Sequence, residues 1–132
     1  MVNRLHHLTF VVRDLQQAES QYRHALGVEP ELRESLPQRG VLTSRFRLGE
    51  VWIVLVQPVA EGIPARHLRE HGEGLLLVSY EVPDLGMALA ACAARGIETD
   101  GPARTGVAGW NIVDLATRAT PGATTQLCAA TR

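Results

Sequence analysis

The sequence is poor in cysteine, and this shortage already limits what the protein can be. Cys92 and Cys128 are its two cysteines, with no metal-type spacing and no secretory segment ahead of them. A small secreted fold that is held together by disulfides needs more cysteines than this. We therefore expect two reduced, structural thiols in a cytoplasmic protein.

Long apolar runs, an excess of one charge and several common loop motifs are also missing. No segment approaches the ~20 apolar residues that span a bilayer, so no membrane partner is expected. The formal net charge of −1 lacks the basic excess typical of nucleic-acid-binding proteins, so no nucleic-acid partner is expected. The chain contains no phosphate-binding glycine loop, Gly-x-Ser-x-Gly elbow or Cys-x-x-Cys pair. The 45% hydrophobic content is nevertheless enough to fill a globular core.

One structural plan occurs twice in the chain. Residues 5–12 and 75–82 are short, apolar and rich in strand-forming residues, which predicts two largely buried strands. Asp14 and Asp84 follow at the position of a helix N-cap, where a carboxylate accepts from the free N–H groups of the first turn. Apolar residues then recur at helical spacing, so each helix has one apolar face for packing on a sheet.

Each repeat continues from its helix into further strands. Gly27 and Gly96 can end the helices in a left-handed conformation, which predicts helices at about 15–26 and 85–95. The later segments are apolar and β-branched, and each half therefore reads β-α-β-β-β. The strands predicted after the helices are 41–48, 51–57, 110–116 and 124–129, with a strand start and loop at 28–40 and a loop at 97–109. We expect an α+β fold in a single domain, residues 1–132, with module 1 at about 1–62, module 2 at about 73–132 and a linker between them.

Short motifs spread over nearly the whole chain carry a family resemblance. They are Leu5-His6-His7-Leu8, Asp14-Leu15, Leu26-Gly27, Leu55-Val56-Gln57-Pro58, Gly72-Glu73-Gly74, Glu81-Val82-Pro83-Asp84-Leu85 and Gln126-Leu127. With two βαβββ modules, the chain resembles the vicinal oxygen chelate superfamily, which includes glyoxalase I, methylmalonyl-CoA epimerase, extradiol dioxygenases and bleomycin-binding proteins. The Gly-Glu-Gly motif is most similar to the epimerase branch. The resemblance implies one curled mixed sheet with a concave cup and with the helices on its convex side.

The resemblance also implies a divalent metal in the cup, with one ligand from the first and one from the fourth strand of each module. The matching positions in this chain are His7, Val54, Leu77 and Gln126. Valine and leucine have no donor atom, and an imidazole with an amide oxygen makes a weak site. We therefore expect no metal cofactor, and expect His7 and Gln126 to hold a metal if one is bound.

Alternation along the strands predicts which side chains line the cup. The ligand-binding candidates are Thr9, Arg45, Arg47, Trp52, Val54, Leu77, Ser79 and Gln126. An aliphatic wall with a few polar groups suits a small, mostly apolar ligand, although the aliphatic residues could equally be core. The arginines would clamp a carboxylate on a concave face and would be ordinary edge charges on a solvent face. A one-residue slip in register would bring His6 or Gln57 to the site instead.

Two residues are candidates for catalysis. His7, buried among apolar neighbours, would favour a neutral imidazole that can accept a proton near neutral pH. Glu81 at a strand end could be a base or could anchor an amine. The alternatives are a purely structural histidine and a solvated carboxylate. Asn111 and Asp114 alternate along their strand, so at most one of them can reach the cup.

Two kinds of function fit these patterns, and whether the protein is an enzyme stays open. One is an isomerase or lyase of the epimerase and glyoxalase type, which abstracts a proton next to a carbonyl group. Its difficulty is the enolate, which a metal stabilises in the family. The other is a drug-sequestering or ligand-binding protein of the bleomycin-resistance type, without turnover. We favour the enzyme, acting as a homodimer on a small-molecule substrate.

Overall fold

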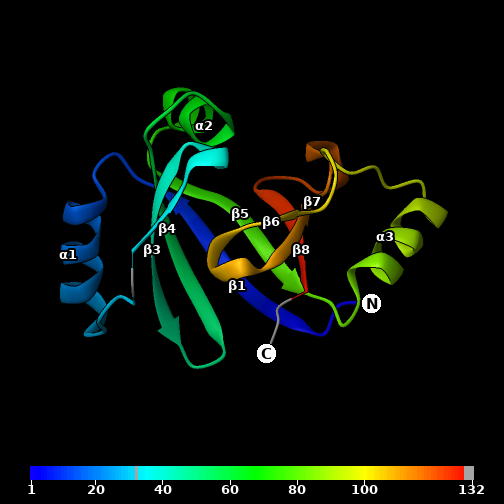
Figure 1. Cartoon of the computed structure of the whole chain (residues 1–132), viewed down its shortest axis with the longest axis horizontal. Coiled ribbons are helices and arrows are strands. Elements are labelled where there is room, and N and C mark those ends of the chain that lie inside the picture. The colour runs from blue at the N-terminus through cyan, green and yellow to red at the C-terminus, as the bar shows by residue number, and fades with distance from the viewer. Residues whose placement is uncertain (32, 130–132) are drawn as a thin grey trace. The chain divides into compact units, whose positions relative to one another are not determined.

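The computed structural model describes residues 1–31 and 33–129, and the chain forms two compact units (Figure 1). Unit 1 contains residues 1–6 and the segment from Leu77 onward, and unit 2 contains His7–Leu76. The last residues of the expected second module, 130–132, lie outside the described residues. Two strands, β1 and β5, begin in one unit and end in the other.

Unit 2 holds most of the first module and the linker that follows it. Its elements are β1 (Arg4–Val11), α1 (Leu15–Leu26), β2 (Glu34–Leu36), β3 (Val41–Leu48), β4 (Val51–Pro58) and α2 (Ile63–His71). Strand β4 pairs parallel with β1 and antiparallel with β3, and β2 pairs antiparallel with β3. Strand β3 and helix α1 have the bounds that the sequence predicts.

Unit 1 repeats this plan. Its elements are β5 (Gly74–Glu81), α3 (Leu85–Ala94), β6 (Arg104–Thr105), β7 (Asn111–Asp114) and β8 (Thr124–Ala129). Strand β8 pairs parallel with β5 and antiparallel with β7, and β6 pairs antiparallel with β7. The strand order of the eight-stranded sheet is β2-β3-β4-β1-β5-β8-β7-β6. The predicted α+β class with two βαβββ modules is confirmed.

The two module helices begin and end for the local reasons that the sequence suggests. Asp14 accepts a hydrogen bond from the N–H of Gln17 at 2.9 Å, and Asp84 accepts one from Met87 at 2.8 Å. Helix α1 ends at Gly27, whose φ of 68° is the left-handed conformation that glycine adopts without strain. The paired caps fix where each helix leaves its preceding strand.

Each unit has its own apolar core between its helix and its strands. In unit 2 the buried residues of this core are Val12, Leu15, Ala18, Phe46, Ile53 and Leu55. In unit 1 they are Val82, Ala88, Cys92, Val113, Leu115 and Leu127. Because side chains alternate along a strand, the opposite faces of the same strands are left for other tasks.

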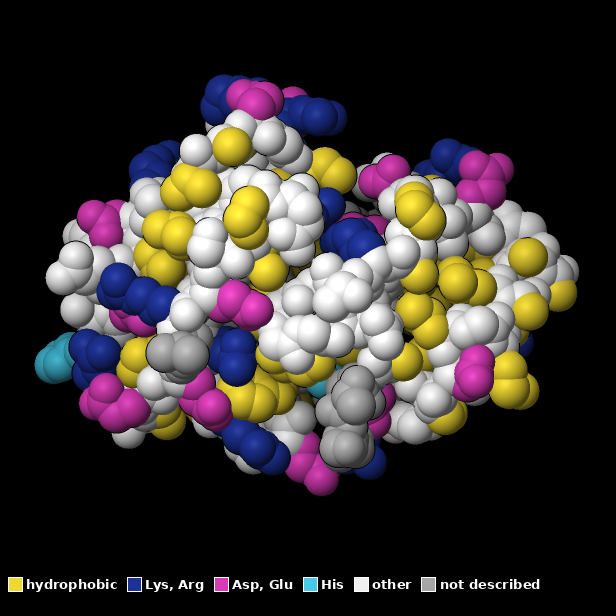
Figure 2. Space-filling model, viewed as in Figure 1, with side chains coloured by type: hydrophobic (Ala, Val, Ile, Leu, Met, Phe, Trp, Pro, Cys, Tyr) yellow, Lys and Arg dark blue, Asp and Glu magenta, His cyan; other side chains and the backbone are white. Residues whose placement is uncertain are grey.

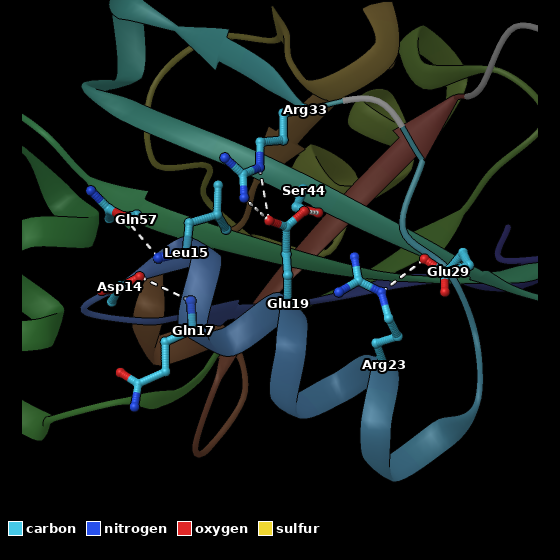
Figure 3. Close-up of polar contacts among 9 residues, drawn as sticks. All are labelled: Asp14, Leu15, Gln17, Glu19, Arg23, Glu29, Arg33, Ser44 and Gln57. Carbon is cyan, nitrogen blue, oxygen red and sulfur yellow. Dashed lines mark hydrogen bonds and ion pairs between the residues drawn. The ribbon is translucent and has the colours of Figure 1, made fainter.

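Gln57 belongs to the helix side of β4. Its side-chain oxygen accepts a hydrogen bond from the N–H of Leu15 at 2.8 Å, so it caps α1 (Figure 3).

Among the described residues, no helix is long and apolar enough to cross a membrane. Charged side chains of both signs are spread over the face in Figure 2, in keeping with the net charge of −1.

Candidate functional site

The face of unit 2 opposite its core gathers most of the candidates from the first module. Strand register places His7 beside Trp52, and Trp52 beside Arg47. The next row holds the other candidates, in the order Thr9, Val54 and Arg45. Neighbouring strands lie about 4.8 Å apart, so these side chains are direct neighbours. We call these two rows the unit 2 face.

Two arginines and an indole form the polar part of the unit 2 face. The guanidinium carbons of Arg45 and Arg47 lie 5.4 and 5.5 Å from the ring centroid of Trp52, within the range of cation–π attraction. Arg45 also lies 3.7 Å from the carboxylate of Glu34. Its Nε is buried and has no hydrogen-bond partner among the described residues. An unpartnered buried donor is costly, so this N–H is suited to an acceptor on a ligand.

The corresponding face of unit 1 is more polar and more deeply buried. One row crosses four strands in the order Glu81, Cys128, Ile112 and Arg104. The adjacent row contains Ser79, Gln126 and Asp114. Leu77 lies one further step along β5, opposite Thr124. We call these residues the unit 1 face.

A chain of polar contacts fixes the orientation of Gln126. Its amide Nε2 donates to Asp114 at 2.8 Å, and Arg104 donates to the other oxygen of Asp114 at 3.0 Å. An ionised carboxylate can only accept, so the amide must turn its nitrogen toward Asp114. The amide oxygen Oε1 of Gln126 is then buried without a partner among the described residues, as is Nε of Arg104. The network therefore leaves one free acceptor and one free donor.

Glu81 and Cys128 lie side by side in the other row. Glu81 is 5% exposed, and its carboxylate lies 3.3 Å from Nε of Arg4. Burial and the charge of Glu81 raise the pKa of Cys128 to about 12, although the Ser79 hydroxyl opposes this rise. The thiol is therefore protonated at neutral pH and is not a nucleophile there.

The expectation that no metal cofactor can be held needs correction. Val54 and Leu77, which are 1% and 6% exposed, are buried aliphatic residues without donor atoms, so the ligand set implied by the resemblance does not fit. However, His6, His7 and Cys128 are all buried and each offers one ligand atom, and these atoms lie within 4.8 Å of one another. Imidazole nitrogen and thiolate sulfur are the preferred ligands of zinc, and a metal bound here would displace the proton that Cys128 holds in the metal-free protein. The sequence prediction failed because it considered only positions supplied by the resemblance.

Two residues at or next to the unit 1 face, Arg104 and Arg4, are absent from the sequence-based candidates, and Asp114 is considered only as one of an alternating pair. Arg104 lies in a segment that the sequence predicts as a loop, and Arg4 precedes the first predicted strand. Asp114 is the member of its alternating pair that reaches the candidate Gln126. All three are charged residues on or next to an apolar strand. The sequence shows this charge, but only the strand register shows that such a residue forms a buried ion pair. The role of all these residues as a site stays a prediction.

The family model described as "Glyoxalase/Bleomycin resistance protein/Dioxygenase superfamily" matches residues 6–113. A relative named "Ethylmalonyl-CoA/methylmalonyl-CoA epimerase" from Cereibacter sphaeroides is 34% identical over 87 residues, which is 64% of this chain and 65% of the relative. The match thus spans just under two thirds of that relative's length. The "Uncharacterized protein YqjC" of Bacillus subtilis is 27% identical over 129 residues, 96% of this chain and 92% of the relative.

Solved structures with the same fold include several epimerases. Streptomyces coelicolor methylmalonyl-CoA epimerase in complex with 2-nitronate-propionyl-CoA has a TM-score of 0.94 at 21% identity, with 100% of both chains covered. Methylmalonyl-CoA epimerase from Mycobacterium tuberculosis has a TM-score of 0.93 at 23% identity, with 99% of this chain and 90% of that chain covered. At this level of identity the likeness shows the fold alone.

Proposed function

Because the chain belongs to the glyoxalase/bleomycin resistance protein/dioxygenase superfamily, we propose that it is an epimerase-like isomerase. It would remove and return a proton on the carbon next to the carbonyl group of a small acyl substrate. The names of its relatives support an acyl-CoA thioester as the substrate class. The observation that carries the proposal is the unit 1 face, which holds the buried carboxylate of Glu81 on β5, an unpartnered acceptor on Gln126 of the neighbouring β8, and an unpartnered donor on Arg104 of β6.

The proposed proton transfer uses Glu81 as the base. Its carboxylate is buried beside Arg4, so it is shielded from water. A base that is positioned within hydrogen-bond reach of a substrate proton contributes roughly 10²–10⁴-fold to a rate. Returning the proton to the opposite face of the same carbon inverts its configuration. His7 in unit 2 is a separate candidate acid or base for the protein without a bound metal.

The enolate that forms in such a step carries negative charge on the former carbonyl oxygen. The unpartnered Nε–H of Arg104 is a donor of the kind that stabilises an oxyanion, because buried donors are effective when water is excluded. Oε1 of Gln126 cannot serve this purpose, since it only accepts. It is suited to hold an N–H or O–H group of the substrate and so to orient the reacting carbon.

A metal fits beside these groups as an additional element. His6, His7 and Cys128 would hold a divalent ion with an affinity for nitrogen and sulfur, such as zinc. When bound, such an ion supplies positive charge that polarises a carbonyl oxygen. The residues of the unit 1 face would still position the substrate and move the proton.

The unit 2 face supports an anionic substrate. Two guanidinium groups over one indole form a preorganised cationic surface, and Nε of Arg45 lacks an acceptor among the described residues. Guanidinium groups bind carboxylates and phosphates in bidentate geometry. A substrate with a free carboxylate or with the phosphates of coenzyme A would supply that acceptor.

The second candidate function is ligand binding without turnover. It is favoured by Val54 and Leu77, which place aliphatic side chains where the family resemblance implies metal ligands. Such a protein would bind a ligand but would exchange no substrate proton. Binding and exchange must therefore be measured separately.

Proton exchange tests the proposed function directly. The purified protein is incubated with methylmalonyl-CoA in D₂O, and loss of the α-proton is followed by NMR, with binding measured by calorimetry. Wild type should exchange the proton, and Glu81→Gln should lower the rate by ~10²-fold or more. The matched control is Glu98→Gln, which changes an exposed carboxylate paired with Arg118 and should leave the rate unaltered. Binding without exchange would favour the second candidate, and normal exchange by Glu81→Gln would rule out Glu81 as the base.

We also propose that the protein acts as a homodimer in the cytoplasm. The two cysteines are buried and unpaired, as in reducing compartments, and the side chains of Met1, Val2 and Met87 are exposed apolar groups. Equilibrium sedimentation tests the dimer, and a single species with the mass of one chain would exclude it.

A further inference from the structure

Helix α2, in the linker between the modules, carries two histidines one turn apart. His67 and His71 stand at i and i+4, so both side chains lie on the same face of the helix. Their ring centroids are 4.7 Å apart, with an angle of 42° between the ring planes. Nothing in the proposed function uses this pair.

The distance between the rings suits a shared metal ion. A zinc ion lies about 2.0–2.1 Å from each coordinating imidazole nitrogen, so two such nitrogens can be up to about 4 Å apart. Rings at the observed separation reach that geometry by small side-chain rotations.

The surroundings of the pair also favour a cation. His71 is the last residue of α2 and lies at the carbonyl end of the helix dipole, which attracts positive charge, and His67 lies one turn before it. The carboxylate of Glu70 lies 3.9 Å from Nε2 of His71. The nearby positive charge of Arg69 is paired with Glu61 through two hydrogen bonds of 2.8 and 3.0 Å. Arg66 is the other cation of α2, so Arg66 and Arg69 are balanced in number by Glu61 and Glu70, and the local net charge is zero.

We propose that His67 and His71 form a bidentate surface site for a divalent transition metal such as zinc. Water molecules complete the coordination, because the side chain of His71 is 63% exposed. A bound metal would cross-link two residues one turn apart in a nine-residue helix. A helix of this length is only marginally stable by itself. The site thus stabilises the segment that joins β4 to β5, and it is separate from the cluster of His6, His7 and Cys128.

Zinc titration of the metal-stripped full chain tests this site. Calorimetry with zinc chloride at pH 7.5 should give one more bound equivalent for wild type than for His71→Ala or His67→Gln. Where residual binding persists, the affinity should be at least about tenfold weaker, since even outer-shell changes cost that much. The matched control is His24→Ala, which removes an exposed histidine of α1 that has no histidine one turn away and should bind like wild type.

Hydrogen exchange of the backbone amides gives a second, independent readout. In wild type, zinc should slow exchange in α2, and His71→Ala should lose this protection while its exchange without metal stays near that of wild type. His71 is exposed, so its replacement should not disturb folding. Equal zinc stoichiometry and affinity in wild type and His71→Ala, or zinc protection that spares α2, would overturn the proposal.

Discussion

Replacement of Glu19 by glutamine tests how α1 is held to its sheet. Glu19 lies in the middle of α1 and is 4% exposed. Its carboxylate accepts hydrogen bonds from Oγ of Ser44 at 2.6 Å and from Nε of Arg33 at 2.7 Å (Figure 3). These contacts join the helix to β3 and to the segment before β2. Glutamine keeps the shape but offers one acceptor and one donor instead of two acceptors.

The size of the effect follows from these two contacts. The hydroxyl of Ser44 is buried, at 1% exposure, so it cannot turn to water for a new partner. In Glu19→Gln, the amide N–H must face either Arg33, which only donates, or the hydroxyl of Ser44, which can accept it only by giving up the hydrogen bond that it now donates. Hydrogen bonds to charged groups contribute about 1.5–3 kcal/mol, and we expect a loss of about 2 kcal/mol in the free energy of unfolding. For a chain of this length that corresponds to a fall of roughly 6–10 °C in Tm.

The effect should depend on pH with a defined sign. Burial alone would raise the pKa of Glu19, but the hydrogen bonds from Arg33 and Ser44 and the charge of Arg33 lower it below its ordinary value. A carboxyl with a lowered pKa in the folded state contributes its stability fully above the unfolded-state pKa. That contribution is lost as pH falls through the folded-state pKa. The difference between wild type and Glu19→Gln should therefore be constant near pH 7 and shrink below about pH 4.5.

Urea denaturation at several pH values measures this difference. Glu29→Gln is the matched control, because Glu29 forms an exposed ion pair with Arg23 at 2.8 Å, and such pairs contribute little. Equal stability of wild type and Glu19→Gln at pH 7 would refute the reasoning. So would a difference that grows as the solution is acidified.

Two further predictions concern local structure. Gly27→Ala places a side chain at φ 68° and should destabilise the protein by about 1–2 kcal/mol in thermal unfolding, and an unchanged Tm would show that α1 can end differently. The native protein should resist alkylation by iodoacetamide at pH 8, because Cys92 and Cys128 are buried and the pKa of Cys128 is raised to about 12. Two thiols should react after unfolding in guanidinium, and rapid native modification of Cys128 would contradict its burial.

The fold could be predicted well because its determinants are local. Asp14 and Asp84 mark helix starts by a short-range hydrogen bond, which is visible in the sequence. Strands β3 and β8 follow from their composition and turn residues. The predicted strands differ from the observed ones where pairing with a neighbouring strand decides whether a segment is a strand and where it ends. Strand β7 is only Asn111–Asp114, shorter than the predicted 110–116, and β2 lies inside a segment that reads mainly as a loop.

The candidate site could be predicted only in part. The faces of β1 and β4 follow from alternation, so the grouping of His7 with Trp52 needs no further information. The partners of the polar groups depend on which strands are neighbours and on their register. Arg104 and Asp114 meet because β6 and β7 pair, and no spacing in the sequence shows this. The cluster of His6 and Cys128 is hidden for the same reason.

The departure of residue 126 from the family pattern has a physical counterpart in this network. A glutamate at that position, which the resemblance implies, would bring its charge to within about 3 Å of Asp114, since the present amide nitrogen lies 2.8 Å from Oδ1. Two buried carboxylates at that distance cannot both stay ionised. With glutamine at position 126, the amide N–H donates a hydrogen bond to Asp114 in place of this repulsion. The carboxylate of Asp114 then forms its ion pair with Arg104 alone. The amide of Gln126 and the carboxylate of Asp114 are therefore complementary, and among the described residues the amide oxygen of Gln126 and Nε of Arg104 stay without a hydrogen-bond partner.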